Sequence, residues 1–167
     1  MKIKYEGITV KTANNGIIFE SKNPFYVLAN RDGFDFQYIN KFDNHYANKD
    51  DLERILVEEH GISVVSTVEY FEKKYFTNIS IFLDVKLDNI TMLNIFRVVT
   101  ETISTVAYTK NALNTDELSN KLGNYYNMVY VVCKSKSEKI ISFDISLYYE
   151  VKELVSQALE QSFNLIE

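Results

Sequence analysis

The stretch TNISIFLDVKLDNI, residues 77–90, decides the fold, because it joins an apolar strand to the start of a long helix. Residues 79–83 are a short apolar run, which is typical of a strand buried in a sheet. Over residues 89–108 the apolar positions recur with a period of 3.6, which predicts a helix with one buried side. Asn78 and Asp84 bracket the strand. They are either ordinary strand ends or the polar rim of a site.

The rest of the chain alternates in the same way between short strands and longer helices. Asn15 and Gly16 predict a hairpin turn, since both tolerate positive φ. Asn48 is a candidate N-cap, and Gly61 is the expected end of that helix. Strands are predicted at residues 3–10, 16–20, 25–29, 36–42, 62–68, 75–84, 127–135 and 139–143, and helices at 48–61, 89–108, 114–123 and 146–166. We therefore predict an α+β fold, a mixed α/β sandwich, with one domain over residues 1–167.

Composition excludes several function classes. Hydrophobic residues make up 46% of the chain and charged residues 25%, as in ordinary globular proteins. The net charge of −5 lacks the basic surplus that nucleic-acid binding needs, so no nucleic-acid partner is expected. No apolar run reaches the roughly 20 residues of a membrane span, and no signal peptide is recognisable, so we expect a cytoplasmic protein without a membrane partner. The 12 Tyr and 11 Phe are compatible with a homo-oligomer.

The usual motifs of cofactor and metal chemistry are missing from the sequence. Neither G-x-x-x-x-G-K-[ST] nor G-x-G-x-x-G occurs, and H-E-x-x-H is absent. His45 and His60 have no His or Cys at metal-ligand spacing. Cys133, the single cysteine, ends an apolar strand and is interpreted as a core residue. We therefore expect neither a metal nor a cofactor.

Polar residues at the ends of apolar runs are the candidates for a site, because loops at strand ends expose side chains from a rigid sheet. An Asn amide both donates and accepts hydrogen bonds, and a carboxylate can act as a general base toward water. These residue types suit amide hydrolysis without a thiol or a metal. The alternative is that they only end strands in Asx-turns, which are common. The candidates are Asn30, Asn40, Thr67, Asn78 and Asp84.

Several motifs follow one another in a recognisable order. They are YVLANRDGFDFQYIN (26–40), GISVVSTV (61–68), NISIFLD (78–84), VVTETISTVAY (98–108), MVYVVCKS (128–135) and VKELV (151–155). From about residue 16 to the end, this order resembles the adenosylcobinamide amidohydrolase family of cobalamin salvage. The chain departs from the family pattern at its glycine pair, where Arg31-Asp32-Gly33 stands, and in the 98–108 helix, where the expected Lys is missing.

The resemblance implies hydrolysis of the amide that joins the aminopropanol arm to the corrin ring, giving adenosylcobyric acid. In that reading Asp84 or Glu101 is the general base, and Asn40, Thr67 and Asn78 position or polarise the amide carbonyl. Asn30 and Thr100 complete the implied substrate-binding set. The expected partner is a corrinoid small molecule.

Two alternatives to this hydrolase remain open from the sequence. In the first, the chain is an inactive homologue that binds a corrinoid or a protein, which the lost glycines and Lys favour. In the second, it hydrolyses some other amide. A corrinoid pocket needs a large apolar concavity with few polar anchors, and Tyr and Phe could line one, although they more often fill cores.

Overall fold

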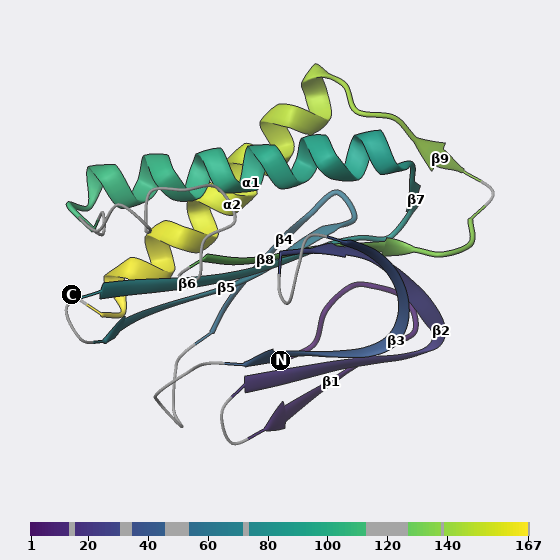
Figure 1. Ribbon diagram of the computed structural model, residues 1–167, viewed down its shortest axis with the longest axis horizontal. Helices are drawn as coiled ribbons and strands as arrows, with labels where there is room; N and C mark the ends of the chain where they lie inside the picture. Colours follow the sequence, from purple (N-terminus) through teal and green to yellow (C-terminus); the bar gives the residue numbers. More distant parts are fainter. Residues whose placement is uncertain are drawn as a thin grey trace.

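A curled β-sheet with two helices against one of its faces makes up the described part of the protein (Figure 1). The computed structural model describes residues 1–13, 16–30, 35–45, 54–71, 74–112, 127–137 and 139–166. Its elements are β1 (Ile8–Ala13), β2 (Gly16–Ala29), β3 (Asp35–His45), β4 (Ile55–Glu59), β5 (Ile62–Phe71), β6 (Lys74–Leu83), β7 (Lys86–Leu87), α1 (Asn89–Thr109), β8 (Asn127–Lys134), β9 (Ile140–Ile141) and α2 (Ile145–Asn164). The predicted α+β class is confirmed.

The main sheet has the strand order β1-β2-β8-β6-β5-β4, and β3 also pairs with β2. β6 and β8 are parallel, whereas the other neighbours in this sheet are antiparallel. A parallel pair needs a long crossover, and α1 lies in the connection between β6 and β8. β7 and β9 form a separate parallel pair of two residues each. The apolar run at residues 79–83 therefore belongs to β6, a buried strand between β8 and β5, as predicted.

β2 is the strand around which the sheet curls. Its first half pairs with β1, its second half pairs with β8, and β3 follows both halves along the other side. The pairing with β3 shifts between Glu20 and Phe25, in a segment that contains Pro24. Proline cannot donate to a ladder, and a bulge tolerates it. The prediction of separate strands at 16–20 and 25–29 was therefore wrong, because one irregular strand spans both.

The sheet is buried on both faces, since the helices cover one face and the curled β1–β3 layer closes over the other (Figure 1). On β6, Ile79 and Ile81 face the helices, while Phe82 faces the concave side. The concave core is rich in aromatic rings, and Ile3 and Tyr5 close it from the segment before β1. A strand with two buried faces shows a continuous apolar run, which explains why apolar and polar residues do not alternate in residues 79–83 of β6.

Residues 55–59 differ from the prediction of a helix over 48–61, because they form strand β4 beside β5. His60 and Gly61 have φ values of 49° and 82° and make the two-residue turn between these strands. Two positive φ angles in succession define the tight turn that matches the twist of a hairpin. Gly61 therefore lies in the turn between two strands and does not end a helix. The predicted N-cap Asn48 lies outside the described residues, as does the predicted helix at 114–123.

Most other predicted elements are confirmed, with shifted ends. The helices at 89–108 and 146–166 correspond to α1 and α2, and the strands at 62–68, 75–84 and 127–135 to β5, β6 and β8. The predicted strand at 3–10 starts later, at Ile8. No helix in the described part of the chain is long and apolar enough to cross a membrane.

Both long helices begin at an aspartate N-cap. The Asp88 side chain accepts a hydrogen bond from Thr91 N at 2.6 Å, and the Asp144 side chain accepts one from Leu147 N at 2.8 Å. The Asp88 pKa is lowered mainly by the hydrogen bond from the Thr91 backbone. Each carboxylate satisfies an N–H group that has no partner inside the helix.

Asp88→Ala should lower the free energy of unfolding by about 1 kcal/mol at neutral pH. Because the folded-state pKa is lowered, this stabilisation is present above the ordinary value of 3.8 and is lost as the pH falls through the lowered value. Urea denaturation at neutral pH and at about pH 2.5 would show the gap between wild type and variant shrinking in acid. Glu160→Ala, at an exposed position of α2, is the control. An equal gap at both pH values would contradict a role for the ionised cap.

Candidate functional site

The concave face of the sheet changes from apolar to polar along β5 and β6. At one end, Phe82 and Val65 belong to the aromatic core. Further along the strands, Thr67 lies opposite Asn78 in the ladder, and Glu69 follows on the same side of β5. These three side chains are 1%, 7% and 3% exposed, so the polar end is buried as well. Thr67 and Asn78 were predicted at strand ends, but they lie in the middle of β5 (Ile62–Phe71) and β6 (Lys74–Leu83), which continue past the apolar runs.

A pocket of about 360 Å³ opens on the concave side, where β2, β3 and β8 meet. Its volume lies near the lower end of the roughly 300–1,000 Å³ typical of ligand sites. The floor is apolar, and charged or amide side chains stand around it. The lining residues are Val27, Ala29, Asp35, Gln37, Ile39, Lys41, Phe42, Asp43 and Tyr130.

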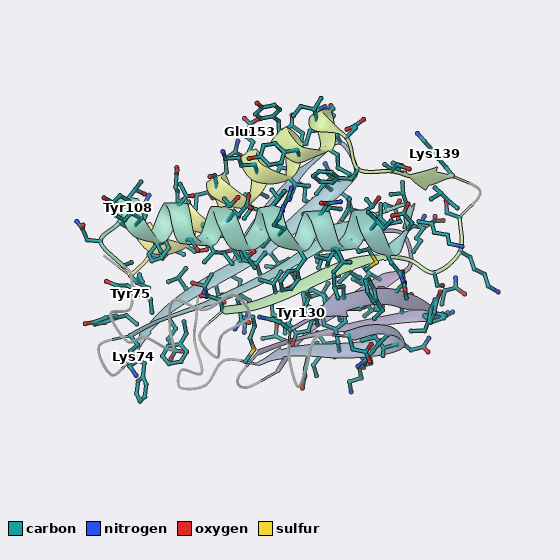
Figure 2. All side chains as sticks on the ribbon, turned by 45° about the horizontal axis from the view of Figure 1, so that its top comes forward. Lys74, Tyr75, Tyr108, Tyr130, Lys139 and Glu153 are labelled. Carbon is teal, nitrogen blue, oxygen red and sulfur yellow. The ribbon has the colours of Figure 1, made fainter. Side chains whose placement is uncertain are left out.

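Tyr130 of β8, which is labelled in Figure 2, is one of the residues that line the pocket. Its ring stacks on Phe42 with the centroids 5.1 Å apart, and its hydroxyl donates a long hydrogen bond of 3.4 Å to the Asp43 carbonyl. Tyr130 lies opposite Ser80 of β6, and Asn78 is two residues before Ser80. The pocket and the Thr67–Asn78 pair are thus successive parts of one concave surface.

Asp84 lies at the other end of β6, about 20 Å from Asn78 at the usual rise of a strand. Its Oδ1 is 2.9 Å from Lys134 Nζ and accepts a hydrogen bond from Glu6 N at 3.3 Å. Lys134 Nζ also lies 3.2 Å from Glu6 Oε2. The hydrogen bond to Asp84 is the main reason why the pKa of Lys134 is raised. The Asp84 carboxylate therefore helps to fix the segment before β1 against β6 and β8.

Glu101 and Thr100 lie on α1, the helix that packs on the face of the sheet opposite the pocket. The Glu101 side chain is 56% exposed and pairs with Arg97 at 3.6 Å on the same helix. The Thr100 hydroxyl donates to the Arg97 carbonyl at 2.9 Å. The two carboxylates expected to serve as a general base are thus separated from each other and from the Thr67–Asn78 pair.

Asn30 and Asn40 make hydrogen bonds that hold the sheet. The Asn30 side chain donates to the Asn127 carbonyl at 2.7 Å and accepts from Val129 N at 2.8 Å, so it continues the pairing of β2 with β8. Asn40 Nδ2 donates to the carbonyls of Ser21 and Lys22 at 3.1 and 3.2 Å, within the bulge of β2. Asn30 follows the last residue of β2 and matches the alternative that the sequence left open, in which polar residues complete strand ends, whereas Asn40 lies within β3 (Asp35–His45).

The pocket residues were missed by the sequence analysis, although one signal was available. In DFQYI, Asp35, Gln37 and Ile39 alternate and therefore share a face of β3. Tyr130 was not selected, because it lies inside the apolar run of the strand predicted at residues 127–135. Cys133 is fully buried as predicted, and burial raises the pKa of its thiol to about 11. Within the described ranges, no group of three or more His, Cys, Asp or Glu side chains is placed to hold a metal ion.

Comparisons of the chain with models of protein families, with curated proteins and with solved structures found no match. The resemblance to the amidohydrolase family therefore rests on the order of its motifs alone.

Proposed function

We propose that the protein binds a small molecule on the concave face of its sheet, with the pocket beside Tyr130 as the site. The observation that supports binding over hydrolysis is the separation of the two candidate bases from the concave site. Asp84 is engaged by Lys134, and Glu101 lies on the outer side of α1. A binding protein needs only a shaped concavity with a few polar anchors, which this pocket supplies.

A corrinoid is the first ligand to test, because the motif order resembles a corrinoid enzyme family. A whole corrinoid is larger than a pocket of about 360 Å³. In this proposal one arm of the ligand enters the pocket on the concave side of β2 and β3, and the ring stays outside. A cytoplasmic location belongs to the same proposal and is supported by the lack of any cysteine besides Cys133. Self-association is a further prediction, which light scattering of the purified chain would test.

Amide hydrolysis is the second candidate, favoured by the pairing of Thr67 with Asn78 on one face. A hydroxyl and an amide side by side could polarise a carbonyl that enters from the pocket. Glu69, two residues after Thr67 on the same side of β5, places a carboxylate on that face. This reading requires the substrate to reach side chains that are almost fully buried, which makes it the weaker of the two.

Adding adenosylcobinamide to the purified protein should change the corrinoid absorption spectrum without releasing adenosylcobyric acid, as followed by mass spectrometry. Ala29→Phe should weaken this binding by tenfold or more, because Ala29 lines the pocket and the larger ring would fill it. Ile90→Phe, at a 71% exposed position on α1, is the matched control.

The same experiment separates the candidates. Release of adenosylcobyric acid that is lost in Asp84→Asn would replace the binding proposal with the hydrolase. If Asp84→Asn still releases adenosylcobyric acid and Glu69→Gln does not, the general base is Glu69 on the concave face. If neither a spectral change nor adenosylcobyric acid is observed, a corrinoid is rejected as the ligand.

A further inference from the structure

The floor of the concave pocket offers an apolar surface of limited size. Val27 and Phe42 are 2% and 7% exposed, and Ala29 and Ile39 lie beside them on the same side of β2 and β3. The volume of about 360 Å³ suits a short aliphatic group and excludes a large ring system. The buried part of a ligand is therefore expected to be a short alkyl chain.

The charges around this floor are mainly negative. Asp35 and Asp43 line the pocket, and Lys41 is the cation among its described lining residues. The Lys41 ammonium lies 3.6 Å from Glu20 Oε1 in the neighbouring strand, and Lys11 pairs with the same carboxylate. The pKa of Glu20 is lowered mainly by its hydrogen bond to Lys11, which keeps this carboxylate ionised beside the two lysines.

Asp35 is the carboxylate best placed to meet a ligand. It is the first residue of β3, and its Oδ1 accepts a hydrogen bond from Phe36 N at 2.7 Å, which orients the side chain. A carboxylate has acceptor sites on two oxygens, so this one bond leaves acceptor capacity. Asp35 also lies opposite Ala29 in the ladder between β2 and β3, and both residues line the pocket.

We propose that the pocket binds a protonated primary alkylamine, either free or as the end of a larger molecule. The ammonium group hydrogen-bonds the Asp35 carboxylate, and the alkyl chain lies on Val27, Ala29, Ile39 and Phe42. The proposal rests on the proposed function in using the same pocket, but it names an amine as the group that enters, which the amide-linked aminopropanol arm of adenosylcobinamide does not present. A charge-assisted hydrogen bond combined with burial of methylene groups distinguishes an amine from an alcohol or a carboxylate of the same length.

The test compares three probes of equal length, n-butylamine, n-butanol and n-butyrate, by NMR titration of isotope-labelled full-length protein at constant ionic strength. Butylamine should bind and shift the signals of β2 and β3, with an affinity at least fivefold above that of butanol, and butyrate should not bind. Asp35→Asn should weaken butylamine about fivefold, as expected for an exposed ion pair. Its affinity for butanol should not change.

Glu101→Gln is the control, because it removes the same charge from the outer side of α1 and should leave butylamine binding unchanged. Equal affinity for butylamine and butanol, an unchanged affinity in Asp35→Asn, or no butylamine binding would each overturn the proposal. If a corrinoid binds and butylamine does not displace it, the amine assignment is overturned and the proposed function stands. If butylamine binds and the corrinoid does not, the amine assignment stands and the corrinoid is rejected as the ligand.

Discussion

Phe82→Ala should lower the free energy of unfolding by about 3–5 kcal/mol, the usual cost of deleting a buried aromatic ring. Phe82 is fully buried on β6, and its ring lies 4.8 Å from Phe19 and 5.9 Å from Tyr5, measured between ring centroids. It thus connects the central strand to β2 and to the segment before β1. The lost ring would leave a cavity between elements that are distant in sequence, where the sheet has little freedom to collapse.

Urea denaturation followed by circular dichroism would measure this loss. Phe82→Leu keeps most of the volume and should cost clearly less, so it remains informative if the alanine variant does not fold. Ile90→Ala, at an exposed position of α1, should change stability by no more than about 0.5 kcal/mol. A loss below about 1 kcal/mol for Phe82→Ala would show that the concave aromatic cluster is not a core.

The elements that sequence predicted well are those whose apolar pattern has one explanation. The run in β6 and the 3.6-residue period of α1 each allow a single assignment, because their length separates strand from helix. Residues 55–59 were ambiguous: Ile55, Leu56 and Val57 are compatible with a short helix or with a half-buried strand. Pairing with β5 decided the outcome, and local sequence does not contain that pairing.

The pocket could not be predicted in the same way, because its residues come together only through the strand order. Val27 and Tyr130 are about a hundred residues apart in the chain and meet because β2 pairs with β8. The search for polar residues beside apolar runs did select Thr67 and Asn78, which lie opposite each other on the concave face, although both are in the middle of their strands. The same criterion also selected Asn30 and Asp84, whose partners Val129 and Lys134 lie on β8. Polarity at a strand end therefore does not separate a site residue from one that fixes neighbouring strands.

Asn30→Ala should test that distinction, with an expected loss of about 2–3 kcal/mol in the free energy of unfolding. The variant removes the bond to the Asn127 carbonyl and the bond from Val129 N, and Val129 is fully buried. A buried N–H left without its acceptor costs about 1–3 kcal/mol, in addition to the second lost bond. Asn94→Ala, which removes an exposed bond within α1, should cost no more than about 0.5 kcal/mol.

Asn30→Asp separates a structural role from a ligand contact. The aspartate retains an acceptor for Val129 N but places a carboxylate oxygen where Nδ2 faced the Asn127 carbonyl, so stability should fall although the shape is kept. If Asn30 serves the sheet, stability will fall while the affinity of the folded protein for its ligand stays unchanged. If Asn30 contacts the ligand, as the family resemblance implies, the free energy of ligand binding will fall by more than the free energy of unfolding. Denaturation and ligand titration of the same variant decide between the two roles. Lower stability weakens the apparent affinity only by reducing the fraction of protein that is folded.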